Sequence, residues 1–127
     1  MSYDIDEKKM AAGMEIVEKL GLLAKGNPTL SDDFRAHTVQ TVFGTIWARD
    51  GLALEQRSLI TLTTLIALNR EHELALHLRG ARNLGISRET IEEVILHVSH
   101  YAGWPVGVTA SGVLVAVWKE MDEEKNA

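Results

Sequence analysis

The sequence predicts an all-α protein, a compact bundle of about six helices formed by a single domain over residues 1–127. Apolar residues recur at helical spacing in successive segments, and no segment alternates apolar and polar residues over the length of a strand. The two prolines and the glycines fall between these segments, as in KGNP at 25–28. A hydrophobic content of 46% is sufficient for the core of one domain of this length.

Capping residues and turn residues set the bounds of the expected helices. Ser31 and Ser87 suit N-cap positions, where a side-chain oxygen accepts a hydrogen bond from the first turn. Gly85 suits the position after a helix, while Gly103 followed by Pro105 separates the last two helices. The predicted helices are 6–23, 31–47, 54–69, 71–84, 87–101 and a last one from Pro105 to about Lys119.

The third predicted helix is apolar on nearly all sides, because its threonines are small and half-apolar. A helix buried on every side needs neighbours all around it. Five other short helices can barely surround it within one small chain. We therefore expect a homo-oligomer that completes its burial.

The composition excludes several classes of function. A net charge of −5 with scattered basic residues predicts neither a nucleic-acid surface nor a membrane partner. The chain has no cysteine, which excludes disulfides, thiolate catalysis and Cys-ligated zinc. No apolar run is long enough to cross a bilayer, and the charged N-terminus has no signal-peptide core. These features predict a cytoplasmic protein.

Ionisable residues interrupt the apolar faces of the fourth and fifth predicted helices. Glu73 and His77 lie four residues apart and therefore share one helix face. A histidine beside a carboxylate in apolar surroundings suits a general acid or base near neutral pH. His97 and Tyr101 share a face of the next helix in the same way. The alternative for each histidine is a purely structural role at a helix interface.

Two arginines in the same region are candidates for binding a carboxylate, because a guanidinium donates two hydrogen bonds to it. They are Arg57 and Arg79, and the alternative for both is pairing with Glu55, Glu73 or Glu92. No metal site is predicted, since neither the Glu-x-x-His spacing of di-iron bundles nor an HExxH motif is present.

A run of short motifs occupies the region from Arg57 to Pro105. They are Arg57-Ser58-Leu59, Glu73-Leu74 with His77, Arg79-Gly80-Ala81, Asn83-Leu84-Gly85, Glu92-Glu93-Val94, His97 and Tyr101-Ala102-Gly103 with Pro105. Together they resemble the carboxymuconolactone decarboxylase family, in its γ-carboxymuconolactone decarboxylase branch. Alkyl hydroperoxidase D proteins of the wider superfamily carry a CxxC before the histidine equivalent to His77. Arg70 and Glu73 stand at those positions here, so thiol peroxidase activity is not expected.

The resemblance implies an alkyl hydroperoxidase D-like helical fold that assembles as a homotrimer or homohexamer. It also implies a carboxy-lyase that converts 4-carboxymuconolactone to β-ketoadipate enol-lactone, in the protocatechuate branch of aromatic catabolism. The substrate accepts the released electron pair itself, so no cofactor is expected. The predicted catalytic residues are His77, Glu73 and His97, and the predicted substrate contacts are Arg57, Arg79, Tyr101, Trp47 and Trp104.

Two alternatives to this function stay open. The branch commonly has a YCGxP pattern, and this chain has Ala102 and Trp104 within the corresponding segment. This difference favours a related enzyme that acts on another lactone or on an enolisable carboxylic acid. The second alternative is a non-catalytic oligomeric module.

Overall fold

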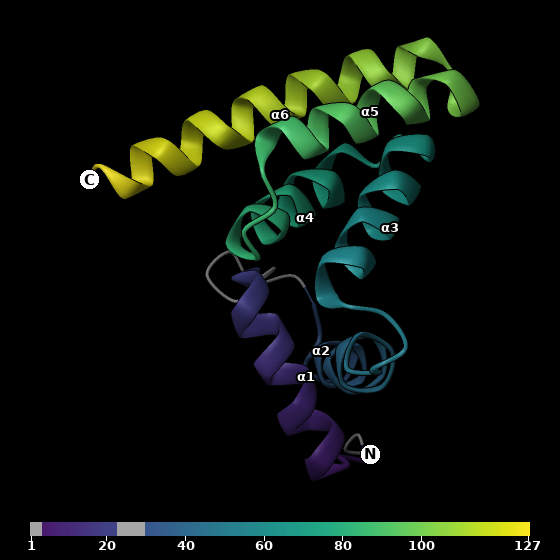
Figure 1. Ribbon diagram of the computed structural model, residues 1–127. Helices are drawn as coiled ribbons and strands as arrows, with labels where there is room; N and C mark the ends of the chain where they lie inside the picture. The colour runs from purple at the N-terminus through teal and green to yellow at the C-terminus, as the bar shows by residue number, and fades with distance from the viewer. Residues whose placement is uncertain (1–3, 23–29) are drawn as a thin grey trace. The chain divides into compact units, whose positions relative to one another are not determined.

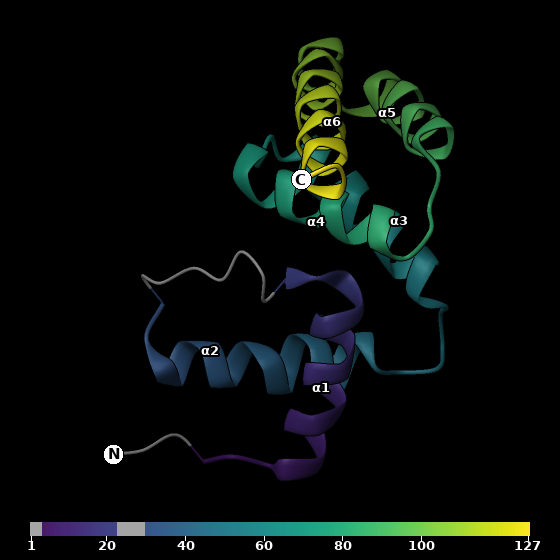
Figure 2. The ribbon, with the colours of Figure 1, turned by 90° about the vertical axis from the view of Figure 1, so that its left-hand side faces the viewer.

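The computed structural model describes residues 4–22 and 30–127, and within these ranges the chain forms helices and no strand (Figures 1 and 2). The prediction of an all-α fold is thereby confirmed. The chain divides into two compact units, Met1–Leu54 and Glu55–Ala127. The prediction that both form one domain stays a prediction.

The N-terminal unit begins with α1, which spans Glu7–Leu20. The Asp6 side chain caps this helix by accepting hydrogen bonds from the amides of Lys8 and Lys9, each at 3.1 Å. The helix ends earlier than expected, because Gly21 adopts a left-handed conformation with φ of 71°. The KGNP segment at 25–28, predicted to end this helix, lies outside the described residues.

The second predicted helix is confirmed over its whole length, but it is of two kinds. Its first part, α2, spans Asp32–Thr38, and the Ser31 hydroxyl caps it by accepting from the amide of Phe34 at 3.1 Å. It continues as η2, a π-helix that spans Val39–Trp47. In keeping with π-helical geometry, the amide of Ala48 donates to the carbonyl oxygen of Phe43, five residues earlier, at 3.0 Å.

Two glycines allow α1 and η2 to pack with their backbones in contact. A Cβ atom on Gly13 would overlap the carbonyl oxygen of Val39, and one on Gly44 would overlap the carbonyl oxygen of Lys9. Any other residue at either position would force the two helices apart. Around this crossing lie the buried apolar side chains of the unit: Ile16, Val17, Leu20, Val39, Phe43 and Trp47.

The C-terminal unit contains four helices, α3 (Leu54–Ala67), α4 (Glu71–Asn83), α5 (Arg88–Ala102) and α6 (Trp104–Lys125). Figure 1 shows α5 and α6 side by side, and α6 also contacts α4. The core residues that these helices share are Leu62, Ile66, Leu74, Leu78, Ala81, Ile91, Ile95, Val98, Ala110, Leu114 and Val117.

Local signals place the breaks between these helices as predicted. The Ser87 hydroxyl caps α5 by accepting from the amide of Thr90 at 3.1 Å. Gly85 and Gly103 have φ of 88° and 114°, a region that favours glycine. No helix of the described residues is long and apolar enough to cross a membrane.

Candidate active site

The acid–base pair predicted from its spacing lies on α4. His77 is largely buried, and this burial lowers the pKa of its imidazole below the ordinary value of 6.5. The Glu73 carboxylate, one helical turn earlier, acts in the opposite direction and raises the same pKa. Because burial is the larger effect, His77 is a neutral imidazole near neutral pH.

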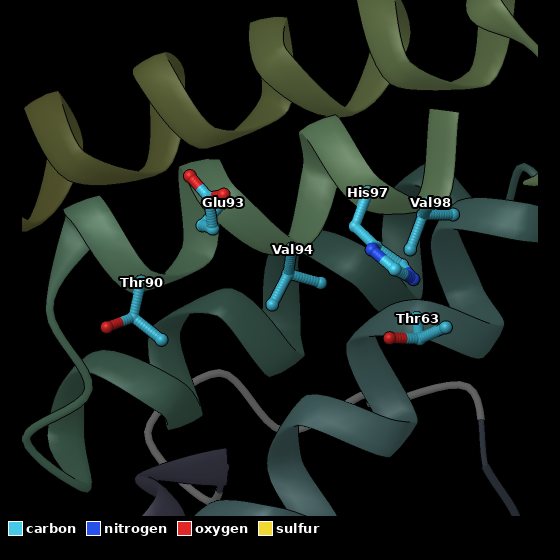
Figure 3. A pocket seen from close by; sticks show the side chains of 6 residues that line it. All are labelled: Thr63, Thr90, Glu93, Val94, His97 and Val98. Carbon is cyan, nitrogen blue, oxygen red and sulfur yellow. The ribbon is translucent and has the colours of Figure 1, made fainter. Parts of the chain in front are cut away.

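His97 lies on α5 beside a hollow of about 390 Å³ (Figure 3). Thr63 of α3 forms one side of the hollow, and α5 forms the other. The lining is mainly apolar, with a few polar groups at its edge. Its residues are Thr63, Thr90, Glu93, Val94, His97 and Val98.

Aromatic contacts connect the end of α5 with the start of α6. The rings of His97 and Tyr101 stack, with centroids 5.1 Å apart and planes at 25°. The ring of Trp104 meets that of His100 edge-on at 5.8 Å. Tyr101 and Trp104 are 83% and 60% exposed, so both can contact a ligand without any rearrangement of the core.

The two candidate arginines differ in their surroundings. Arg79 donates to Glu120 at 3.0 Å and to Glu124 at 2.5 Å, both on α6. These partners are not the three glutamates considered from the sequence. A substrate carboxylate at Arg79 would therefore compete with two carboxylates that are already bound there.

Arg57 is half-buried in the first turns of α3. Its neighbour Ser58 is fully buried, and among the described residues its hydroxyl has no hydrogen-bond partner. By contrast, the hydroxyls of Thr61 and Thr63 each donate to a carbonyl oxygen one turn earlier in α3. The first turns of α3 thus contain a half-buried guanidinium beside a buried hydroxyl.

Trp47, the remaining predicted substrate contact, belongs to η2 in the N-terminal unit. It is 6% exposed and packs against Phe43, with ring centroids 5.9 Å apart. Its predicted contact with a substrate stays a prediction.

The structure thus joins the predicted residues in pairs within single helices, Glu73 with His77 and His97 with Tyr101. His77 is not among the residues that line the hollow at His97. Within the described ranges, no three His, Asp or Glu side chains gather as ligands for a metal ion.

The sequence prediction missed the other residues around the hollow. One signal for them was present, because Glu93 precedes His97 by four residues, as Glu73 precedes His77. No local pattern indicated that Thr63 would face the same hollow from another helix.

Most of this chain is similar in sequence to known proteins. Residues 32–116 match the family described as the carboxymuconolactone decarboxylase family. The chain is 36% identical over 122 residues to a 4-carboxymuconolactone decarboxylase of Acinetobacter baylyi, covering 91% of each protein. It is 44% identical over 68 residues to a nitrosuccinic acid decarboxylase of Metarhizium robertsii, covering 54% of this chain and 48% of that protein. These findings support a carboxy-lyase, and the chain belongs to the carboxymuconolactone decarboxylase family.

Proposed function

We propose that the protein decarboxylates 4-carboxymuconolactone to β-ketoadipate enol-lactone, within the protocatechuate branch of aromatic catabolism. The observation that carries this proposal is the 36% identity to a 4-carboxymuconolactone decarboxylase over 91% of both proteins. The Glu73–His77 pair adds support, because the reaction needs a proton donor.

The chemistry begins with the bond between the γ carbon of the lactone and the departing carboxylate. When this bond breaks, carbon dioxide leaves and the electron pair delocalises through the ring double bond onto the lactone carbonyl oxygen. A proton then adds to the carbon beside the carbonyl, and the double bond shifts to the other side of the ring. The reaction consumes one proton and transfers no electrons to another molecule.

In this proposal His77 supplies the proton. Its pKa is low in the free protein, but a substrate with two carboxylates adds negative charge, which raises the pKa of a nearby histidine. Glu73 acts in the same direction. His97 is the second catalytic group and donates to the developing oxyanion, an interaction worth about 3 kcal/mol in comparable sites.

The activity assay is the release of carbon dioxide from 4-carboxymuconolactone. We expect His77→Gln to lower kcat by about 100-fold to 10,000-fold, the usual contribution of a general acid, while the circular dichroism spectrum is unchanged. His72→Gln is the matched control, since His72 is exposed on the same helix. Full activity of His77→Gln would remove His77 from the mechanism, and an inert wild type would refute the proposed substrate.

The substrate carboxylates require a cationic partner. In this proposal that partner is Arg57 in the first turns of α3, whereas Arg79 pairs with Glu120 and Glu124 of α6. We expect Arg57→Gln to raise KM by about tenfold or more, from loss of a charge-assisted hydrogen bond. Arg79→Gln should instead lower the free energy of unfolding by about 1 kcal/mol and leave KM nearly unchanged. If Arg79→Gln raises KM and Arg57→Gln does not, the substrate carboxylate is assigned to Arg79.

Tyr101, Trp104 and Trp47 are proposed to exclude water from the substrate.

A second candidate is a decarboxylase of another acid, favoured by the 44% identity over 68 residues to the nitrosuccinic acid decarboxylase. Loss of carbon dioxide beside a nitro group leaves an anion whose charge the nitro oxygens carry. That reaction also needs an oxyanion donor and a proton donor. Parallel assays with the lactone and nitrosuccinic acid decide between the two substrates.

A further inference from the structure

We propose that a second copy of the chain packs against one face of α5 and α6, around a two-fold axis. This α5–α6 face is formed by Leu96, Trp104, Val108, Ser111 and Val115. The contact joins two α6 helices in antiparallel order and is centred between Val108 and Ser111. The face shares no residue with the lining of the hollow at His97, and the proposal does not rest on the proposed function.

The α5–α6 face carries large apolar side chains that the chain itself leaves uncovered. Leu96, Trp104, Val108 and Val115 are exposed by 48%, 60%, 63% and 53%. The first three line one groove between the two helices, and Val115 lies two turns beyond Val108 on the same side of α6. Exposed apolar side chains that gather on one side of a molecule mark an interaction surface.

The groove between α5 and α6 suits protein side chains better than a small molecule or a lipid surface. The two helices lie close together (Figure 1), because a Cβ atom on Gly107 would overlap the Ser99 hydroxyl. The volume of the groove is about 240 Å³, below the range of small-molecule sites, about 300–1,000 Å³. A lipid surface attracts basic residues beside apolar ones, and the groove is lined by Glu92 and by no lysine or arginine.

The exposed residues of α6 form a stripe whose spacing is symmetric about its middle. Its members are four, three and four residues apart, so they share one side of the helix: Trp104, Val108, Ser111 and Val115. Reversing the helix leaves this spacing unchanged. A second α6 in antiparallel order therefore places Trp104 opposite Val115 and Val108 opposite Ser111. A two-fold contact between identical chains requires such a self-complementary surface, which favours a second copy as the partner.

Charge favours the antiparallel order. Among the described residues no side chain caps the start of α6 at Trp104, where the helix dipole is positive. The last turns of α6 are acidic and include Glu120, Asp122 and Glu123. Antiparallel pairing brings the acidic end of each helix toward the positive start of the other. Parallel pairing would instead set the two acidic ends side by side, where they repel.

Sedimentation equilibrium of the full chain tests whether this contact forms. Each chain makes one such contact, so the wild-type assembly should contain an even number of chains. Val108→Glu should halve its mass and leave the circular dichroism spectrum unchanged. Ala116→Glu is the matched control, because it places the same charge at an exposed position of α6 outside the stripe. An odd number of chains in the wild type, or a mass that Val108→Glu does not change, would overturn the proposal.

Disulfide formation tests the pairing of residues, since the natural chain has no cysteine. Trp104→Cys and Val115→Cys, co-expressed as separate chains and oxidised, should give covalent dimers. Either variant alone should give none, because the antiparallel pairing separates two copies of the same position by about 16 Å along the helix, and a disulfide spans Cα atoms no more than about 7 Å apart. Covalent dimers from either variant alone, or none from the two together, would overturn the antiparallel pairing.

Discussion

At the scale of single residues, two opposing effects act on the pKa of His77. Burial favours the neutral imidazole, whereas the Glu73 carboxylate favours the protonated form. A histidine in this balance responds strongly to any further negative charge, and the proposed substrate brings two. In the proposed mechanism, this added charge converts a group that is neutral in the free protein into an acid in the complex.

This balance predicts the direction of a measurable change. The pKa of His77, followed by nuclear magnetic resonance, should lie below 6.5, and Glu73→Gln should lower it further because it removes the group that raises it. Glu71→Gln, an exposed change on the same helix, should leave it nearly unchanged. A rise in the His77 pKa in Glu73→Gln would contradict this account.

The lowered pKa also links His77 to stability. The unfolded chain binds this proton more tightly than the folded chain, so the free energy of unfolding should fall as pH drops below 6.5 toward the folded-state pKa. The loss should be smaller in His77→Gln. Urea unfolding at several pH values measures the difference.

At the scale of elements, contact between α1 and η2 depends on two positions without a side chain. Gly13 and Gly44 let each helix backbone reach a carbonyl oxygen of the other, at Val39 and Lys9. The spacing of apolar residues predicted both helices. It did not predict this close crossing, and it does not distinguish a π-helix from an α-helix over one short segment.

Alanine substitutions test the crossing. Gly13→Ala and Gly44→Ala should each lower the free energy of unfolding by about 1–3 kcal/mol, the usual cost of overpacking. Gly112→Ala is the control, because its Cβ atom would meet open space within a helix, and it should stabilise by up to about 1 kcal/mol. Urea unfolding followed by circular dichroism gives all three values. If neither Gly13→Ala nor Gly44→Ala changed the free energy of unfolding, the close contact between α1 and η2 would not contribute to stability.

At the scale of the whole molecule, α3 buries only part of its apolar surface against the other helices. On α3, Ser58, Leu62 and Ile66 are buried, whereas Ile60 is 54% exposed and Leu68, just after the helix, is 62% exposed. The expectation that other copies of the chain complete the burial of this helix therefore stays a prediction with a defined surface.

Sedimentation analysis tests this prediction directly. We expect a mass three or six times that of the 14.1 kDa chain, and we expect Ile60→Glu to lower it without loss of helical content. Glu123→Lys, an exposed change on α6, is the control. A chain that sediments as a monomer at all concentrations would refute the assembly.

The sequence by itself determined the helices and the caps and breaks at Ser31, Ser87 and Gly103, because these act through hydrogen bonds and dihedral angles of neighbouring residues. It also determined the Glu73–His77 pair, since helical geometry places residues four apart on one face. It did not determine the end of α1 at Leu20 or the end of α6 at Lys125, six residues beyond the predicted end. Only the tertiary structure decided the partners of Arg79, which lie 41 and 45 residues further along the chain.

The hollow at His97 also required the tertiary structure. It depends on Thr63 of α3 facing α5, and the backbone contact at Gly13 and Gly44 depends in the same way on how two helices cross. Such contacts arise from the packing of whole helix surfaces. Local sequence patterns do not contain that information, because they describe one helix at a time.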